Sequence, residues 1–258
     1  MEEKPEIVLL AIDCDTTRIV YHYLKQYFTF EKVIIEDKPS RKELIKRRVK
    51  KLGIKTVAGQ LLFQTIGVKY ISFGSKKRIH KIIQANNLNL KPIDEKVVTR
   101  VQSVNTAEAK QVLLQVSTKL VVVNGTRIIA KNILQGVQKT FINTHLGVTP
   151  YYRGVHGGYW ALVNSDKGNF GATVHLVDAG IDTGSVLCHA KAQPSAEDNF
   201  VTYPYLQIAA VLPCIKQVIE KVIDGKIQVQ NVPKGNSRLF SHPTLWQYFY
   251  HRLVKGVK

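Results

Sequence analysis

The chain has 258 residues, of which 45% are hydrophobic and 22% charged, as in ordinary globular proteins with one large core. Its 37 lysines and arginines outnumber 19 acidic residues, and the formal charge of +18 favours anionic partners such as nucleotides, phosphates or nucleic acid. The charged start, MEEKPE, and the short apolar run at 7–12 indicate neither a secretory signal nor a membrane span, so we expect a cytoplasmic protein without a membrane partner.

The three cysteines, Cys14, Cys188 and Cys214, lie far apart in the sequence and form no C-x-x-C motif. This pattern indicates neither a zinc site nor a disulfide framework. It agrees with a reducing cytoplasm.

The first quarter of the chain alternates apolar strands with helices. Residues 6–12 (EIVLLAI) have the near-continuous apolar character of a buried parallel strand. The elements predicted next are a helix over 17–28, a strand over 32–36 and a helix that runs from its cap at Ser40 to Leu52. This order predicts an α/β fold, namely a Rossmann-like, open, mostly parallel sheet with helices on both faces.

The turn after the first strand, Asp13-Cys14-Asp15, has two carboxylates and no glycine. A phosphate held at a helix start needs a close approach of the backbone, which glycine allows and neighbouring carboxylates oppose. The turn therefore argues against a substrate phosphate at this position.

Basic residues concentrate in the runs 41–51 (RKELIKRRVKK) and 76–81 (KKRIHK). Apolar residues at near-helical spacing make the first run an amphipathic helix with a basic, solvent-facing side. No aromatic residue interleaves with either run, as a platform for single-stranded nucleic acid would require. A solvated basic face is therefore favoured, and a nucleic-acid partner is left open.

The rest of the chain supplies further elements. We expect helices over 55–67, 76–86, 107–116 and 156–164, another beginning at 130–134, strands over 97–101 and 120–123, and paired strands over 171–177 and 185–192. Residues 200–223 form the longest expected helix, and a short strand over 226–229 follows it.

Two stretches in the second half carry polar side chains where strands end. In residues 139–158 (KTFINTHLGVTPYYRGVHGG), Asn143 and His145 alternate with apolar neighbours, so a strand sends both to one face. In residues 171–184, a strand leads into the turn DAGIDTG, which contains Asp178 and Asp182. Each residue also has a purely structural interpretation, as a turn cap, a core imidazole or a turn former.

Taken together, the motifs resemble those of the folate-dependent formyltransferases. The shared order is Asn-x-His, then Gly-x-x-Pro-x-Tyr-Arg-Gly, then Asp-x-Gly-x-Asp-Thr-Gly, and the resemblance is sharpest over 119–193. That family includes glycinamide ribonucleotide, methionyl-tRNA and nucleotide-sugar formyltransferases. The resemblance implies that Asn143, His145 and Asp182 are the catalytic residues.

The resemblance also implies a formyl donor, N10-formyltetrahydrofolate. In the family, the pterin ring lies against the loop after a central strand and against the acidic turn. The cofactor-binding residues implied here are Arg127, Ile128, Ile129, Asp178, Ala179, Gly180 and Ile181. No metal is implied, because the histidines and aspartates lack the spacing of a zinc site.

The implied chemistry is attack of an amine on the formyl carbon, through a tetrahedral oxyanion. The amide of Asn143 can donate to the oxyanion, and His145 can donate as an imidazolium or relay a proton. Asp182 can hold the imidazolium or position a water.

The sequence leaves the amine acceptor open among several classes. We favour a small anionic substrate, most of all an amino-sugar nucleotide. The alternatives are glycinamide ribonucleotide, hydrolysis of formyl-folate, and a non-catalytic protein that binds folate or nucleic acid. A homodimer is left open.

The expected domain division places a catalytic domain at residues 1–230 and a short helical tail at 231–258. In the tail, Trp246, Phe249 and Leu253 fall on one helical face, which predicts that they pack in the core. The tail is shorter than the oligonucleotide-type barrel that tRNA-directed members of the family carry.

Overall fold

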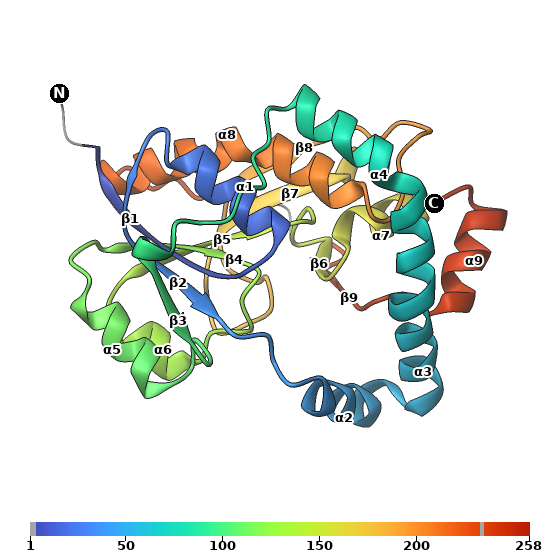
Figure 1. Ribbon diagram of the computed structural model, residues 1–258, viewed down its shortest axis with the longest axis horizontal. Coiled ribbons are helices and arrows are strands. Elements are labelled where there is room, and N and C mark those ends of the chain that lie inside the picture. Colours follow the sequence, from blue (N-terminus) through green and yellow to red (C-terminus); the bar gives the residue numbers. More distant parts are fainter. Residues whose placement is uncertain (1–3, 233–234) are drawn as a thin grey trace.

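The computed structural model describes residues 4–232 and 235–258. Its main sheet has seven strands in the order β3-β2-β1-β4-β5-β7-β8 (Figure 1). The strands are β1 (Glu6–Ile12), β2 (Thr29–Glu36), β3 (Val98–Val101), β4 (Leu120–Asn124), β5 (Thr140–His145), β7 (Gly171–Leu176) and β8 (Val186–Lys191). The first five strands in that order, from β3 to β5, pair in parallel. Strand β7 pairs antiparallel with both β5 and β8. The expected α/β fold with a mostly parallel sheet is confirmed.

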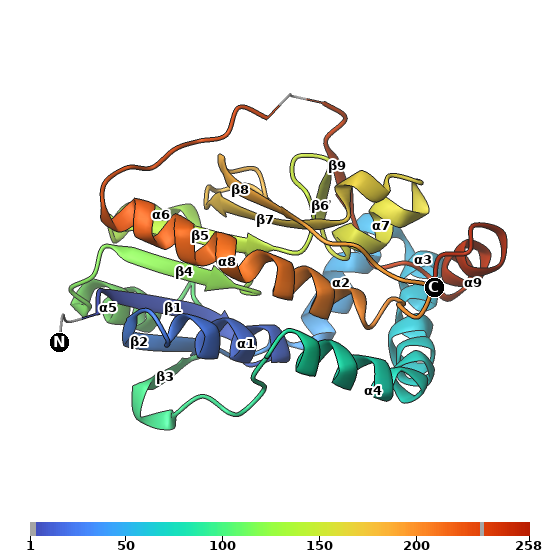
Figure 2. The same cartoon turned by 90° about the horizontal axis from the view of Figure 1, so that it is seen from above.

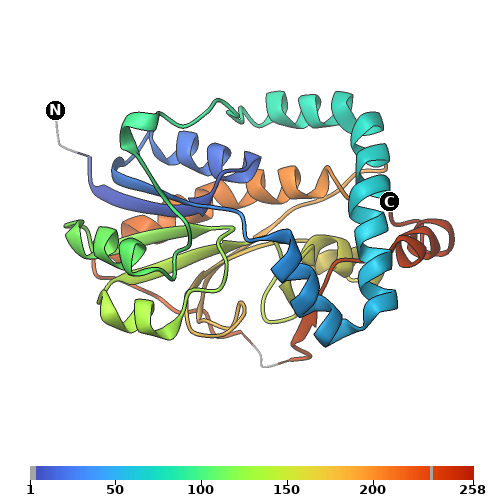
Figure 3. The ribbon, with the colours of Figure 1, turned by 60° about the horizontal axis from the view of Figure 1, so that its bottom comes forward.

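Helices cover both faces of the sheet (Figures 1 and 2). The described helices, which Figure 3 shows from a third side, are α1 (Asp15–Leu24), α2 (Arg41–Leu52), α3 (Ile54–Leu62), α4 (Val68–Ala85), α5 (Ala107–Gln115), α6 (Lys131–Gly136), α7 (Gly157–Val163), α8 (Tyr203–Ile223) and α9 (Leu245–Val254). The alternation along β1 decides which helices pack on which face. Leu9 points toward α1 and α8, and Leu10 points toward α5 and α6, and both side chains are fully buried.

The predicted helices over 55–67 and 76–86 belong to one longer helical segment. A π-helical turn, Phe63–Gly67, joins α3 to α4, and residues 68–75 are helical as well. Phe63 is fully buried, and its ring packs 4.8 Å from that of Tyr248. The π turn is therefore fixed by tertiary packing, which a local sequence pattern does not reveal.

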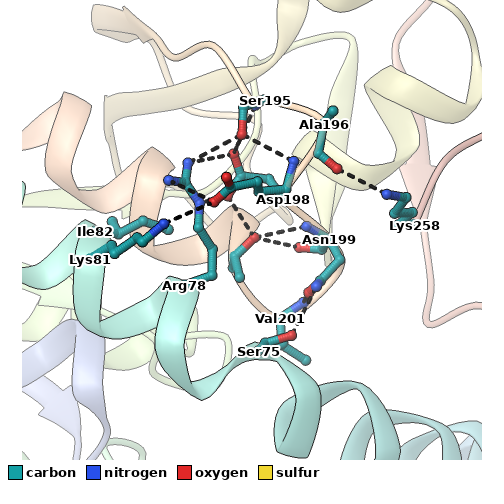
Figure 4. A network of polar contacts seen from close by, with 12 residues as sticks. Ser75, Arg78, Lys81, Ile82, Ser195, Ala196, Asp198, Asn199, Val201 and Lys258 are labelled. Atoms are coloured by element: carbon teal, nitrogen blue, oxygen red, sulfur yellow. Dashed lines mark hydrogen bonds and ion pairs between the residues drawn. The ribbon is translucent and has the colours of Figure 1, made fainter.

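A polar network ties α4 to the loop that precedes α8 (Figure 4). The guanidinium of Arg78 donates to both carboxylate oxygens of Asp198, each at 2.8 Å. The Asp198 side chain is fully buried and also accepts from the backbone and hydroxyl of Ser195 and from Thr202. Burial alone would raise the pKa of Asp198, but these donors together lower it.

The C-terminal segment packs onto the rest of the chain. Its strand β9 (Arg238–Phe240) pairs with β6 (Tyr152–Gly154), and α9 lies outside α3 (Figure 1). Thr244 caps α9 in a capping box. The domain division near residue 230 stays a prediction, and residues 233–234 of the tail lie outside the described residues.

The predicted core stripe of the tail is wrong. Trp246, Phe249 and Leu253 are 52%, 50% and 81% exposed, while Tyr248 and His251 are buried. The inward face of α9 carries Tyr248, whose ring packs on Phe63, and His251, whose Nδ1 lies 2.7 Å from the hydroxyl of Tyr159.

Three smaller expectations are also corrected. Residues 226–229 are not a strand, although the backbone N–H of Gln230 donates to Val186. Ser40 precedes α2 without a capping hydrogen bond from its side chain. Cys188 and Cys214 form a disulfide, because β8 and α8 pack against each other.

None of the described helices combines the length and the apolar character that crossing a membrane requires.

Candidate active site

Asn143 and His145 project from the carboxyl end of β5, between β4 and β7. Nε2 of His145 donates to the carbonyl of Tyr152 across 2.8 Å. A Cβ at Gly147 would overlap both partners of this hydrogen bond, so glycine is required there. The chain therefore turns tightly after β5, and the hydrogen bond at Nε2 fixes the orientation of the imidazole.

Asp182 reaches the same place from the turn after β7. Its backbone has φ of +50°, a left-handed conformation that aspartate tolerates better than most residues. The N–H of Gly154 donates to Oδ2 of Asp182 at 2.9 Å, and Arg153 donates to the carbonyl of Ile181 at 3.1 Å. Strand β6 therefore fixes the acidic turn against the end of β5.

The three predicted catalytic side chains lie together. Nδ1 of His145 is 3.4 Å from Oδ2 of Asp182. His175, opposite Asn143 on β7, joins them: its Nε2 is 3.1 Å from Nδ2 of Asn143 and 3.6 Å from Oδ1 of Asp182. Sequence reasoning missed His175, although a histidine in the otherwise apolar strand 171–176 was a usable signal.

Hydrogen bonding fixes the imidazole tautomers. A carbonyl only accepts, so Nε2 of His145 carries a proton and Nδ1 is the acceptor that faces Asp182. In His175, Nδ1 donates to the carbonyl of Leu176 at 2.7 Å. Its Nε2 lies between Nδ2 of Asn143 and Oδ1 of Asp182, and Asn143 keeps a second amide N–H for another partner.

Burial and charge set the ionisation of the pair. Burial lowers the pKa of His145, and the Asp182 carboxylate opposes this only in part, so the imidazole is neutral near pH 7. Burial would raise the pKa of Asp182, but His175, His145 and the N–H of Gly154 lower it. Of the two roles expected for His145, a neutral imidazole favours the relay of a proton over donation as an imidazolium.

These residues line a cleft of about 770 Å³. Its wall includes Asn143, His145, Asp182, Arg127, Ile128, Ile129, Asp178, Gly180 and Ile181. Ala179 belongs to the same turn but is not part of the lining.

A buried carboxylate anchors one end of the cleft. Glu36, at the end of β2, accepts from the backbone N–H of Arg127 at 2.6 Å and from that of Val104 at 3.0 Å. It also forms an ion pair with the Arg127 guanidinium at 2.7 Å. The Arg127 side chain is thus held on β2, and it donates to the carbonyls of Asp37 and Gln102. The adjacent Ile128 is 54% exposed.

The other end of the cleft contains residues that the sequence analysis did not single out as a site. They are Arg48, Lys51, Gln60, His156, Phe240, Ser241 and His242. They come from α2, α3, the segment after β6 and the segment around β9. The basic run at 41–51 is therefore not only a solvated face.

Comparison with known proteins gives a family match and several relatives. The sequence profile of the formyl transferase family matches residues 33–204. A methionyl-tRNA formyltransferase of Thermodesulfovibrio yellowstonii is 33% identical over 107 residues, which are 42% of this chain and 34% of that protein. A GDP-perosamine N-formyltransferase of Brucella melitensis is 26% identical over 98 residues, 38% of each chain. The chain thus spans little more than a third of these curated relatives.

Solved structures share the fold. A sugar N-formyltransferase from Shewanella sp FDAARGOS_354 superposes with a TM-score of 0.55 at 13% identity, over 90% of this chain and 75% of that one. A phosphoribosylglycinamide formyltransferase from Anaplasma phagocytophilum gives a TM-score of 0.57 at 16% identity, over 93% and 98% of the two chains. At these identities the likeness concerns the fold alone.

Proposed function

The chain belongs to the formyl transferase family, and we propose that it transfers a formyl group from N10-formyltetrahydrofolate to a primary amine of an amino-sugar nucleotide. The observation that carries this proposal is the geometry of the cleft. Nδ1 of a neutral, buried His145 faces the Asp182 carboxylate at 3.4 Å, and Asn143 stands beside them with a free amide N–H.

The end of the cleft near Glu36 fits a folate. Ile128 offers an exposed apolar side chain, and the buried carboxylate of Glu36 holds the backbone of the same loop in place. Asp178, Gly180 and Ile181 form the facing wall. When bound there, the folate supplies the formyl group. An exposed apolar residue beside a rigid loop is a suitable surface for a flat ring.

Asn143, His145 and Asp182 each have a separate role in the proposed reaction. The amide N–H of Asn143 stabilises negative charge on the formyl oxygen as the amine attacks. His145 accepts the amine proton at Nδ1, and Asp182 stabilises the resulting imidazolium. His145 would return this proton to N10 of the folate as the bond between N10 and the formyl carbon breaks, so that tetrahydrofolate leaves and the imidazole is neutral again. No nucleophilic side chain is needed, because the substrate amine attacks directly.

Two observations support an amino-sugar nucleotide as the acceptor. A relative that aligns over 38% of the chain is a GDP-perosamine N-formyltransferase. The formal charge of +18 and the cations of α2 at the cleft suit an anionic substrate.

A second candidate is an amine carried on a tRNA. It is favoured by the relatives that are methionyl-tRNA formyltransferases, at 33% and 38% identity over 107 and 82 residues. The exposed cations of α2 also suit a polyanion.

One screen distinguishes the candidates. The purified protein is incubated with N10-formyltetrahydrofolate and, separately, with amino-sugar nucleotides, glycinamide ribonucleotide and aminoacylated methionyl-tRNA. Mass spectrometry then follows the gain of one formyl group. Formylation of an amino-sugar nucleotide, lost in an Asn143→Ala variant, is the expected result. Formylation of another acceptor alone would assign the substrate elsewhere, and none with any acceptor would refute the transfer.

A further inference from the structure

The cations that line the cleft come from one face of α2. Arg48 and Lys51 are three residues apart, so they lie on neighbouring turns of the same face. Both line the cleft, and no residue of α2 is buried. Within residues 4–232 and 235–258, neither cation forms an ion pair. The cleft therefore contains two positive charges whose counter-charge the described chain does not supply.

A buried acceptor lies at the same end of the cleft. Gln60 of α3 is 1% exposed, and its Nε2 donates to the carbonyl of His242 at 2.8 Å and to Oγ of Ser241 at 3.3 Å. Its Oε1 is buried without a hydrogen-bond partner among the described residues. Buried acceptors are nearly always paired, so this oxygen calls for a donor from a ligand.

Two neutral imidazoles complete the wall. Nε2 of His156 lies 2.8 Å from Nδ1 of His242. Burial, with the neighbouring His242 and the charge of Arg48, lowers the pKa of His156 to about 3, and burial with the charge of Arg48 lowers that of His242 to about 4. The imidazoles therefore stay uncharged, and the positive charge at this end of the cleft is that of α2.

We propose that this end of the cleft is a phosphate subsite, in which Arg48 and Lys51 bind the diphosphate of a nucleoside diphosphate-linked substrate and Gln60 Oε1 accepts from one of its hydroxyl groups. The inference rests on the proposed function and deepens it. The two cations need an anionic partner, and the neighbouring Gln60 oxygen needs a hydrogen-bond donor. A phosphorylated sugar supplies both groups, whereas a carboxylate or an inorganic phosphate supplies only the anion.

The burial of Gln60 favours a small molecule over RNA. Gln60 lines the cleft beside Arg48 and Lys51, where a small molecule would bind, whereas an RNA backbone would first meet the outer cations of α2, among them Arg47 and Lys50. These two residues are exposed, do not line the cleft and are also three residues apart. They offer a control with the same charge, helix and spacing.

The test compares the double variants Arg48→Ala/Lys51→Ala and Arg47→Ala/Lys50→Ala. Binding of GDP, UDP and dTDP to the full chain, without folate, is measured by calorimetry at fixed ionic strength. We expect at least one diphosphate to bind the wild type and to bind the first variant about 10-fold or more weakly, because charge-assisted contacts are lost. The control variant should change by less than about 2-fold, as screened surface charges do.

Other outcomes overturn the subsite. Failure of the wild type to bind any of the three at millimolar concentration refutes it, and so does an equal loss in both variants, which reports general charge. Tighter binding of a stem–loop RNA than of any diphosphate, lost equally in both variants, assigns α2 to RNA.

The outcome is separable from that of formyl transfer. If diphosphate binding depends on Arg48 and Lys51 but no amine is formylated, the subsite stands and the proposed activity is wrong. If an amino-sugar nucleotide is formylated with an unchanged KM in the Arg48→Ala/Lys51→Ala variant, the activity stands and the subsite is wrong.

Discussion

Nδ1 of His145 lies 3.4 Å from the Oδ2 atom of Asp182, and in the neutral imidazole this nitrogen is a proton acceptor. Before a proton arrives both atoms are acceptors and form no hydrogen bond, and they become an ion pair once Nδ1 is protonated. An interaction that strengthens as the reaction proceeds lowers the barrier, whereas one of constant strength does not. The carboxylate is kept ionised by its other donors, so it is ready for this role.

Removal of any one of the proposed catalytic groups should reduce formyl transfer. We expect Asn143→Ala, His145→Ala and Asp182→Asn each to lower kcat by about 100-fold or more, as loss of an oxyanion donor or an acid–base group does. Turnover of each purified variant measures this, with circular dichroism as the check of fold. His80→Ala, on the exposed side of α4, is the matched control and should leave kcat unchanged. A variant with near-normal turnover would remove that residue from the mechanism.

The pH dependence of kcat/KM should report the neutral His145. Burial lowers its pKa below the ordinary 6.5, so we expect activity to hold from pH 7 down past 6.5 and to fall only at lower pH, as the imidazole becomes protonated. The Asp182 carboxylate favours the protonated imidazole and so raises its pKa. In Asp182→Asn the acid limb should therefore move to lower pH, at a reduced maximum. A limb that moves to higher pH would contradict this assignment.

The buried Glu36 should control the donor end of the cleft. In Glu36→Gln the ion pair with Arg127 is lost, and we expect the KM for formyl-folate to rise by about 10-fold while that for the amine stays constant. The melting temperature should fall as well, because the fully buried position 36 no longer supplies a charged partner to Arg127, whose side chain is 29% exposed. Glu95→Gln is the control, since its ion pair with Arg100 is exposed and should contribute little. An equal rise in both KM values would mean that Glu36 stabilises the fold without positioning the loop.

Local signals in the sequence were sufficient where an element carries its own pattern. The apolar run at 6–12 predicted β1 to the residue, and the helix expected over 107–116 begins at Ala107, where the hydroxyl of Thr106 accepts from the N–H of Ala109. The alternation of Asn143 and His145 placed both on one strand face, and the structure adds Asp182 from the facing turn. These features depend on spacing along one segment.

Features that depend on contacts between distant segments were not predictable. The cleft-facing side of α2 is defined by residues around 240, and the tautomer of His145 by the carbonyl of Tyr152. His175 enters the site only because β7 runs antiparallel to β5. The strand expected at 226–229 had suitable residues but lacks a partner strand in the described chain.

The orientation of α9 gives a prediction about stability. Tyr248 is buried against Phe63, whereas Leu253 is 81% exposed. The two side chains should therefore differ sharply in their contribution to the free energy of unfolding. We expect Tyr248→Ala to lower the free energy of unfolding by about 3 kcal/mol or more, since it leaves a cavity in an aromatic cluster. Leu253→Ala should change it by less than about 0.5 kcal/mol.

Urea denaturation followed by circular dichroism measures both values, with the slope of the transition as a check that unfolding stays two-state. The opposite ranking, in which Leu253→Ala is the costlier change, would mean that the outward stripe of α9 is covered in solution. Urea denaturation at several protein concentrations would then show what covers the stripe. If the stability of the wild type rises with protein concentration, the stripe is covered by a second copy of the chain.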